Sequence, residues 1–147
     1  MFSNILITCI GNICRSPMAE ELFRQKGHAQ LGFPIEVRSA GTHALVEHSA
    51  DSHAEELMTE LGLDITEHRA QKLNAELANW ADIILVMDLE QKRYIEGKHQ
   101  TTRGKVFRLL ENDGVDIPDP YKRGMESFKA ALVSIQKGTD EWIDKIS

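Results

Sequence analysis

Short apolar runs alternate with helical patterns along the whole of this 147-residue chain. Apolar, β-branched runs of about five residues are typical of strands buried in a sheet. Apolar residues that recur every three or four positions are typical of helices with one buried face. Strands are predicted over 4–9, 35–39, 82–87 and 105–109, and helices over 16–31, 54–61, 74–80, 88–96 and 128–146. This alternation predicts βαβ units, and therefore an α/β fold with a parallel sheet covered on both faces.

Polar residues mark where several of these helices begin. Ser16 followed by Pro17 predicts a helix start, with the serine as N-cap and the proline at the first helical position. Asn74 is a second candidate cap. Asp88, with Gln91 three residues later, has the pattern of a capping box.

Charge and apolar content restrict the class of protein. Lys and Arg number 17 against 23 Asp and Glu, a formal net charge of −6, which argues against binding to nucleic acid or to anionic lipid. The longest apolar run, 83–87, is far shorter than the roughly 20 residues of a membrane span. Residues 1–4 lack the basic start of a signal peptide. We therefore expect a single cytoplasmic domain over 1–147 that does not insert into membranes.

The two cysteines, Cys9 and Cys14, are too few for a disulfide-stapled scaffold. Two thiols this close in a reducing compartment point to chemistry, redox or metal binding. His43, His48 and His53 are also evenly spaced, but their spacing suits neither one helical face nor a zinc pattern. We expect neither a metal ion nor a cofactor.

The segment after the first predicted strand has the form of an anion-binding loop. In parallel sheets, ligands bind beyond the carboxyl ends of the strands. A loop of this size can wrap a tetrahedral oxyanion with its backbone N–H groups, and an arginine at its end can grip two oxygens. Glycine and asparagine suit the positive φ angles that such a loop requires. The predicted loop runs from Cys9 to Ser16 through Ile10, Gly11, Asn12, Ile13, Cys14 and Arg15.

Cys9 is the strongest potential nucleophile at a strand end. The positive potential of the loop and of the following helix favours its thiolate form. A thiolate that faces a bound phosphate implies in-line displacement at phosphorus and a phosphocysteine intermediate.

The leaving group of such a reaction needs a proton, and no residue before Cys9 is acidic. Asp119 is the best candidate general acid, because Pro118 and Pro120 hold it on a stiff loop. Tyr121 beside it offers an aromatic wall for a ring-shaped substrate. The competing carboxylates are Asp88, Asp113 and Asp116.

Several segments resemble the low-molecular-weight protein tyrosine phosphatases. The stretch 5–20, ILITCIGNICRSPMAE, carries most of the resemblance. Segments 39–41, 87–88 and 119–121 match later family motifs in the right order, so the resemblance covers essentially the whole chain. It implies a four-stranded, twisted, Rossmann-like parallel sheet with helices on both faces. It also implies hydrolysis of phosphotyrosine in proteins.

The resemblance assigns expected roles to individual residues. Cys9 matches the nucleophile, Arg15 the phosphate clamp and Asp119 the general acid. A supporting hydrogen-bond network would hold the loop and stabilise the thiolate through its serine; its members are Asn12, Ser16, Ser39 and His68.

Two positions are similar to a bacterial branch of the family. Leu45 and Lys122 stand where many eukaryotic members carry aromatic residues. The branch is paired with tyrosine autokinases of capsule and exopolysaccharide export, so such a kinase is the expected protein substrate. We expect Leu45 and Tyr121 to form walls of the substrate slot, and the chain to act as a monomer.

Two other functions fit the same loop. An arsenate reductase on this fold passes its disulfide to a further cysteine, and none follows Cys14. An inactive phosphate-binding module is disfavoured because Cys9, Arg15 and Asp119 are all present. Cys14 itself is either a buried filler or a resolving thiol for oxidised Cys9, and we favour the second role.

Overall fold

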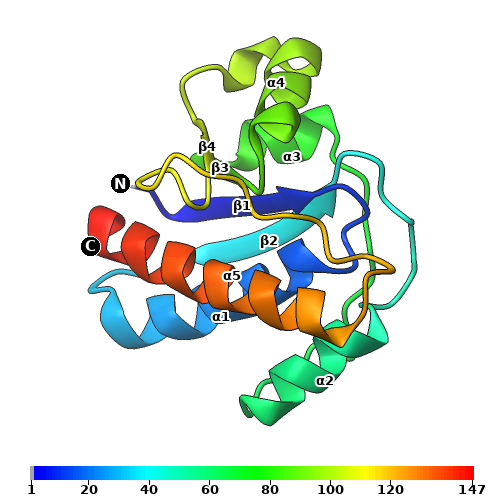
Figure 1. The fold of residues 1–147 in the computed structure, drawn as a ribbon. Coiled ribbons are helices and arrows are strands. Elements are labelled where there is room, and N and C mark those ends of the chain that lie inside the picture. The colour runs from blue at the N-terminus through cyan, green and yellow to red at the C-terminus, as the bar shows by residue number, and fades with distance from the viewer. Residues whose placement is uncertain (1) are drawn as a thin grey trace.

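The computed structural model describes residues 2–147, which form a four-stranded parallel sheet with helices on both faces (Figure 1). The α/β fold expected from the alternating pattern is confirmed. In chain order the elements are β1 (Asn4–Cys9), α1 (Arg15–Gln30), β2 (Glu36–Gly41), α2 (Ser52–Glu60), α3 (Ala75–Trp80), β3 (Ile83–Val86), α4 (Leu89–Lys98), the short 3-10 helix η1 (Gln100–Thr102), β4 (Val106–Arg108) and α5 (Met125–Ile146).

The order of the strands places the end of β1 at a binding crevice. The sheet order is β2-β1-β3-β4, so β1 pairs with β2 on one side and with β3 on the other. In the pairing with β2, Cys9 lies opposite Gly41. After β1 the chain adds β2 on one side of it, and after β2 it crosses over to add β3 on the other side. Ligands bind outside the carboxyl ends of the strands where the strand order reverses in this way.

Two hydrophobic layers enclose the sheet. Helices α1, α2 and α5 cover one face, where Phe23 and Phe128 are fully buried. Helices α3 and α4 cover the other face (Figure 1), where Leu77, Ile84 of β3 and Ile95 belong to one buried hydrophobic cluster. The loops that begin α4 and α5 therefore approach the carboxyl edge of the sheet from opposite faces.

The predicted start of the first helix is wrong. Helix α1 begins at Arg15 instead of after Ser16, and Cys14 stands at its N-cap without a side-chain hydrogen bond to any residue of 2–147. The Ser16 hydroxyl accepts a hydrogen bond from Asn12 Nδ2 and lies 3.0 Å from Cys9 Sγ. The serine is thus engaged by the preceding loop and does not cap the helix.

Strand ends also differ from the prediction. Strand β2 extends to Gly41 instead of Ser39, because its pairing with β1 continues as far as Cys9. Ser39 is therefore a strand residue. Strand β3 is one residue shorter than predicted at each end: Met87 follows it, and Asp82 precedes it and accepts hydrogen bonds from Ser3 N and Asn4 N.

The two other predicted caps are confirmed. Asn74 Oδ1 accepts a 2.8 Å hydrogen bond from Leu77 N, and Asp88 Oδ1 accepts one of 2.8 Å from Gln91 N. The side-chain oxygen of Gln91 accepts a hydrogen bond from Met87 N. A capping box would instead use the N–H of the cap residue, Asp88, which is one position later. A further bond from Gln91 Nε2 to Asp88 Oδ2 holds this carboxylate in place.

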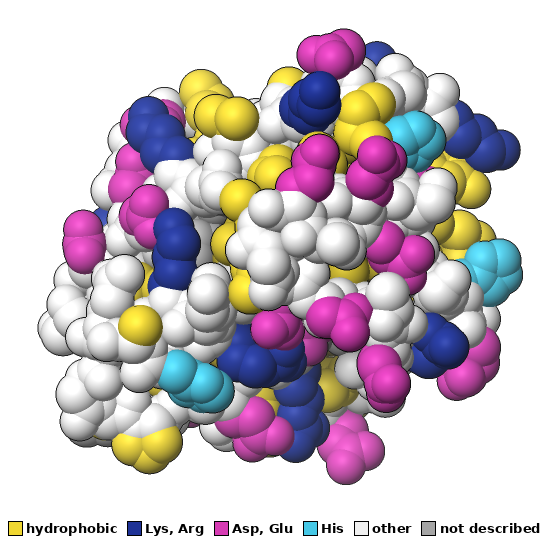
Figure 2. Space-filling model, turned by 90° about the horizontal axis from the view of Figure 1, so that it is seen from below, with side chains coloured by type: hydrophobic (Ala, Val, Ile, Leu, Met, Phe, Trp, Pro, Cys, Tyr) yellow, Lys and Arg dark blue, Asp and Glu magenta, His cyan; other side chains and the backbone are white. Residues whose placement is uncertain are grey.

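The surface carries charged side chains of both signs. Acidic and basic side chains are interspersed over the face seen from below (Figure 2). Within residues 2–147, no helix is both long enough and apolar enough to cross a membrane.

Helix α5 approaches the end of β4 through Gly138. A Cβ atom at this position would lie 2.7 Å from Leu109 Cγ and 2.8 Å from Leu109 O. We expect Gly138→Ala to lower the free energy of unfolding by about 1–2 kcal/mol, because overpacking exceeds the gain in helix propensity. Gly97→Ala in α4, where the new methyl meets nothing within 4 Å, is the control and should stabilise by about 0.5–1 kcal/mol. Urea denaturation measures both, and equal stabilisation would contradict the close approach.

Candidate functional site

The loop from Cys9 to Ser16 surrounds a cavity of about 140 Å³, which we call the loop cavity. Asp119 and Tyr121 approach it from the segment before α5, and Leu45 from the segment after β2. The structure thus brings together most of the residues singled out in the sequence. The cavity lining comprises Cys9, Ile10, Gly11, Ile13, Cys14, Arg15, His43, Leu45, Asp119 and Tyr121.

Asn12 holds the loop in its shape. Its φ of 59° is left-handed, a conformation that needs support in a residue other than glycine. Its Oδ1 accepts a hydrogen bond from Gln71 N at 2.9 Å, and its Nδ2 donates to Ser16 Oγ at 2.7 Å and to Ser39 Oγ at 3.0 Å. The corresponding prediction for Gly11 is wrong, since the positive-φ residues of 2–147 do not include it.

The direction of these bonds orients the hydroxyl beside Cys9. An amide nitrogen only donates, so Ser16 Oγ and Ser39 Oγ both act as acceptors toward Asn12. The Ser16 proton is then free to point at Cys9 Sγ, 3.0 Å away. The Ser39 proton points at Glu20 Oε1. The arrangement suits a thiolate at Cys9, because a thiolate accepts the Ser16 hydrogen bond.

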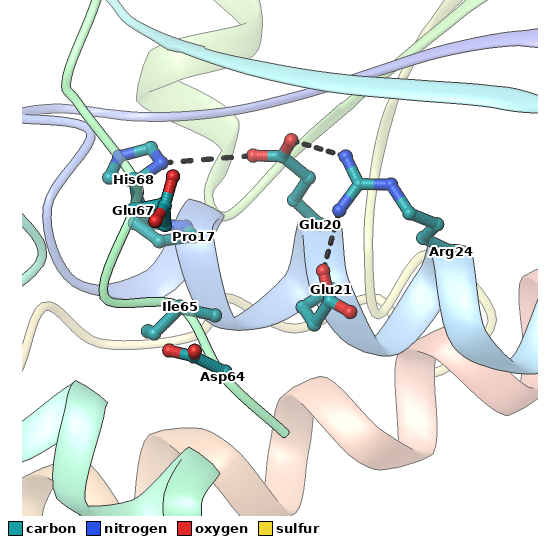
Figure 3. A pocket seen from close by; sticks show the side chains of 8 residues that line it. All are labelled: Pro17, Glu20, Glu21, Arg24, Asp64, Ile65, Glu67 and His68. Atoms are coloured by element: carbon teal, nitrogen blue, oxygen red, sulfur yellow. Dashed lines mark hydrogen bonds and ion pairs between the residues drawn. The ribbon is translucent and has the colours of Figure 1, made fainter.

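His68 supports the loop from behind. Its Nε2 lies 2.7 Å from the carbonyl oxygen of Asn12, and a carbonyl only accepts, so Nε2 carries a proton. Its Nδ1 lies 3.9 Å from Glu20, which also binds Arg24 at 2.6 Å (Figure 3). The imidazole therefore orients the backbone of Asn12 and leaves the amide group to Gln71 and the serines.

A second cavity of about 220 Å³ lies beside this histidine (Figure 3). Four carboxylates line it against one arginine, a charge balance that repels phosphate. Its lining shares no residue with that of the loop cavity, so the two cavities are separate. The ionisable residues of its lining are Glu20, Glu21, Arg24, Asp64, Glu67 and His68.

Arg15 is buried to 99% and connects the loop to two other segments. Its Nη1 donates to Ile117 O at 2.6 Å and lies 3.6 Å from Asp88, and its Nη2 lies 3.9 Å from Asp119. Within residues 2–147, its Nε is buried without a hydrogen-bond partner. Buried guanidinium N–H groups rarely stay unpaired, so this atom is suited to an oxyanion in the loop cavity.

Asp119 is placed better than its competitors to exchange a proton in this cavity. Its Oδ1 accepts a hydrogen bond from Tyr121 N, and its side chain is 41% exposed beside Arg15. Asp113 is paired with Lys137 at 2.7 Å, and Asp116 with Arg108 at 3.1 Å. Asp88 caps α4, as described above, with both of its oxygens bound to Gln91.

Cys14 is buried, and that burial is the main reason why the pKa of its thiol is raised. The nearby negative charges of Cys9, Asp51 and Asp119 raise the pKa further, and Arg15 lowers it only in part. Cys14 is therefore a neutral thiol at physiological pH. Both Cys9 and Cys14 are free.

Three residues of the site were not found from the sequence. Glu20 and Gln71 belong to the network around Asn12, and His43 lies at the mouth of the loop cavity, with its ring centroid 5.0 Å from that of Tyr94. Glu20 stands one helical turn after Ser16 and could have been found from that spacing. Gln71 and His43 lie in irregular segments, where no periodicity marks them.

A family model described as low molecular weight phosphotyrosine protein phosphatase matches residues 4–147. A Ralstonia solanacearum protein named probable low molecular weight protein-tyrosine-phosphatase EpsP is 50% identical over 146 residues, which cover 99% of this chain and 97% of that protein. The phosphatase Wzb of Escherichia coli K12 is 38% identical over 152 residues, covering 100% and 97%.

Solved structures agree with these relatives. The tyrosine phosphatase Wzb from Escherichia coli K30, in complex with sulphate, superposes with a TM-score of 0.91 at 33% identity and covers 100% of both chains. The YwlE arginine phosphatase from Geobacillus stearothermophilus gives a TM-score of 0.89 at 32% identity, covering 98% of this chain and 92% of its own.

The neutral state of Cys14 determines how oxidised Cys9 should behave. If Cys14 is the resolving thiol, its thiolate attacks the Cys9 sulfenic acid, forming the disulfide and releasing hydroxide that becomes water. Because the pKa of Cys14 is raised, the rate should be slow at pH 7 and increase about tenfold per pH unit toward pH 9. Trapping the sulfenic acid with dimedone at timed intervals measures this rate. Cys14→Ser should abolish the decay, and a decay independent of both pH and Cys14 would remove this cysteine from the redox chemistry.

Proposed function

The chain belongs to the low-molecular-weight phosphotyrosine protein phosphatases, and we propose that it hydrolyses phosphotyrosine through a phosphocysteine intermediate on Cys9. The observation that carries the proposal is the loop cavity that Cys9 and Arg15 line together, with the Ser16 hydroxyl 3.0 Å from Cys9 Sγ and, within residues 2–147, no hydrogen-bond partner for the buried Nε of Arg15. This arrangement offers a nucleophile, a donor that stabilises its thiolate, and a clamp for the phosphoryl oxygens.

In the first step, the Cys9 thiolate attacks phosphorus in line with the leaving oxygen. A bond forms between sulfur and phosphorus while the bond from phosphorus to the tyrosine oxygen breaks. Arg15 and the loop N–H groups stabilise the equatorial oxygens as charge develops on them. Asp119 gives its proton to the departing phenolate, since it lines the same cavity at its exposed edge.

In the second step, water attacks the phosphocysteine. Asp119, now ionised, accepts the proton of the water molecule, and Cys9 leaves as a thiolate. The Ser16 hydroxyl stabilises the departing sulfur as it did the attacking one. The products are tyrosine and inorganic phosphate, and the enzyme returns to its starting state.

The walls of the loop cavity suit an aromatic ester. Ile10 and Tyr121 stand at its rim, where they are 40% and 39% exposed, and Leu45 and Ile13 line its interior. Apolar walls of this kind favour a flat ring that reaches the sulfur from outside. Phosphoserine is shorter, so its backbone would meet the rim before its phosphate reached Cys9.

The physiological substrate we propose is a tyrosine autokinase of capsule or exopolysaccharide export, on which the chain acts as a cytoplasmic monomer. The support is the similarity to the bacterial tyrosine phosphatases named EpsP and Wzb, together with Leu45 and Lys122 at the positions that mark this branch. The likeness to an arginine phosphatase makes phosphoarginine the necessary comparison substrate.

Cys9→Ser tests the nucleophile. We expect turnover of phosphotyrosine to fall at least about a thousandfold while phosphate and vanadate still bind, because the loop amides and Arg15 remain. Turnover assays and calorimetric titration measure the two properties separately. Near-normal turnover by the variant would remove Cys9 from the mechanism.

The substrate assignment is tested separately on the wild-type enzyme. A preference for phosphoarginine over phosphotyrosine would overturn it.

Asp119→Ala tests the general acid. A basic leaving group needs the proton in the transition state more than an acidic one does. We therefore expect hydrolysis of phosphotyrosine to fall by about 10²–10⁴-fold, and that of the better-leaving nitrophenyl phosphate to fall much less. Asp113→Ala and Asp116→Ala are matched controls, since each removes a nearby carboxylate that is held in its own ion pair. Equal losses on both substrates would transfer the role to Asp88.

A further inference from the structure

Two more cavities adjoin the loop cavity. One, of about 120 Å³, shares Ile10 and His43 with it and lies against the start of α4; we call it the α4 cavity. The other, of about 240 Å³, shares Asp119 with it and lies against the start of α5; we call it the α5 cavity. Because α4 and α5 cover opposite faces of the sheet (Figure 1), the two cavities flank the loop cavity on opposite sides.

The α4 cavity suits a cationic side chain. Tyr94, His43 and Ile10 provide walls against which the aliphatic part of a lysine or arginine can pack. Two carboxylates line it, but both oxygens of Asp88 are already bound to Gln91. Within residues 2–147, the carboxylate of Glu90 has no ion pair and no hydrogen bond. Glu90 is therefore the charge available to a ligand.

The α5 cavity has the opposite character. Pro118, Pro120 and two alanines of α5 make its surface partly apolar, and Arg123 is its cation. In the part of the chain that the structure describes, the guanidinium of Arg123 has no ion pair and no hydrogen bond. The other charged residue of the lining, Asp119, lies beside Arg15 and accepts a hydrogen bond from Tyr121 N.

The start of α5 adds to the positive potential on this side. Its first turn lacks a side-chain cap within residues 2–147, and Ser127 of that turn lines the cavity. Uncapped N–H groups at the start of a long helix favour an anion. The acidic residue of the turn, Glu126, lies 3.6 Å from Lys129, which partly offsets its charge.

We propose that a phosphotyrosine segment of the substrate lies across the loop cavity with a basic side chain in the α4 cavity and an acidic side chain in the α5 cavity. The proposal rests on the proposed function, because it needs the phosphotyrosine in the loop cavity. In an extended segment, the residues before and after a tyrosine lie on opposite sides of it. The two cavities likewise lie on opposite sides of the loop cavity. The enzyme therefore distinguishes the order of charges around the tyrosine, and Glu90 and Arg123 determine this specificity.

Four phosphotyrosine peptides test the polarity. They carry lysines before and glutamates after the tyrosine, the reverse order, alanines on both sides, or glutamates on both sides. Each kcat/KM is divided by that for free phosphotyrosine measured with the same enzyme. We expect one of the two mixed orders to exceed the other by about fivefold or more, mainly through KM, as two partly exposed ion pairs would give. Equal values for the two mixed orders would overturn the proposal.

Charge reversal assigns the preference to residues. Glu90→Lys combined with Arg123→Glu should reverse the preferred order, and Glu90→Gln and Arg123→Gln should each weaken it. Glu76→Lys and Arg103→Glu are matched controls: Glu76 is an exposed first-turn residue of α3, Arg103 is an exposed loop residue, and neither belongs to the three cavity linings. We expect both controls to keep the wild-type order. Unchanged preference in the Glu90 and Arg123 variants would overturn the proposal.

Free phosphotyrosine separates this proposal from the function on which it rests. If wild-type enzyme leaves free phosphotyrosine intact, the proposed function fails and the polarity fails with it. If free phosphotyrosine is hydrolysed and the two mixed peptides react equally, only the polarity is wrong. A preference that disappears in 0.5 M salt supports ion pairing as its cause.

Discussion

The side chain of Asn12 is the contact on which the rest of the candidate site depends. It holds its own backbone in a left-handed conformation through Gln71, and it donates to the two serines that stand on either side of it. Both consequences come from one amide group. The loop backbone is held in its shape, and the Ser16 proton is directed at Cys9. A residue without an amide would lose the shape and the electrostatics together.

The second constraint is a buried guanidinium. Removing Arg15 from water is costly unless its N–H groups are paired. The fold meets this requirement with the Ile117 carbonyl after β4 and with Asp88 after β3, and the proposed reaction adds a phosphoryl group at Nε. The strand order is what brings these segments to the end of β1. The fold and the geometry of the candidate site therefore depend on the same feature, the reversal of strand order beside β1.

The sequence predicted those parts of the structure that depend on neighbours along the chain. Alternating patterns predicted the strands, local polar residues predicted the caps at Asn74 and Asp88, and the spacing of Cys9 and Arg15 predicted the loop. The errors concern contacts between distant segments. Ser16 does not cap α1 because Asn12 engages it, and Gln71 entered the site through a hydrogen bond that spans 59 residues. Without the family resemblance, His68 would not have been placed near the loop.

Asp88 belongs at once to the start of α4 and to the surroundings of Arg15. Helix capping requires only an acceptor oxygen, which asparagine, serine or threonine supplies as well as aspartate does. The charge beside the guanidinium is a separate property of the same side chain. Replacement by asparagine would keep an acceptor oxygen for the helix start and remove the negative charge from beside Arg15. The charge beside Arg15 can thus be changed from outside the loop, through a residue of another strand end, while every residue of the loop stays the same.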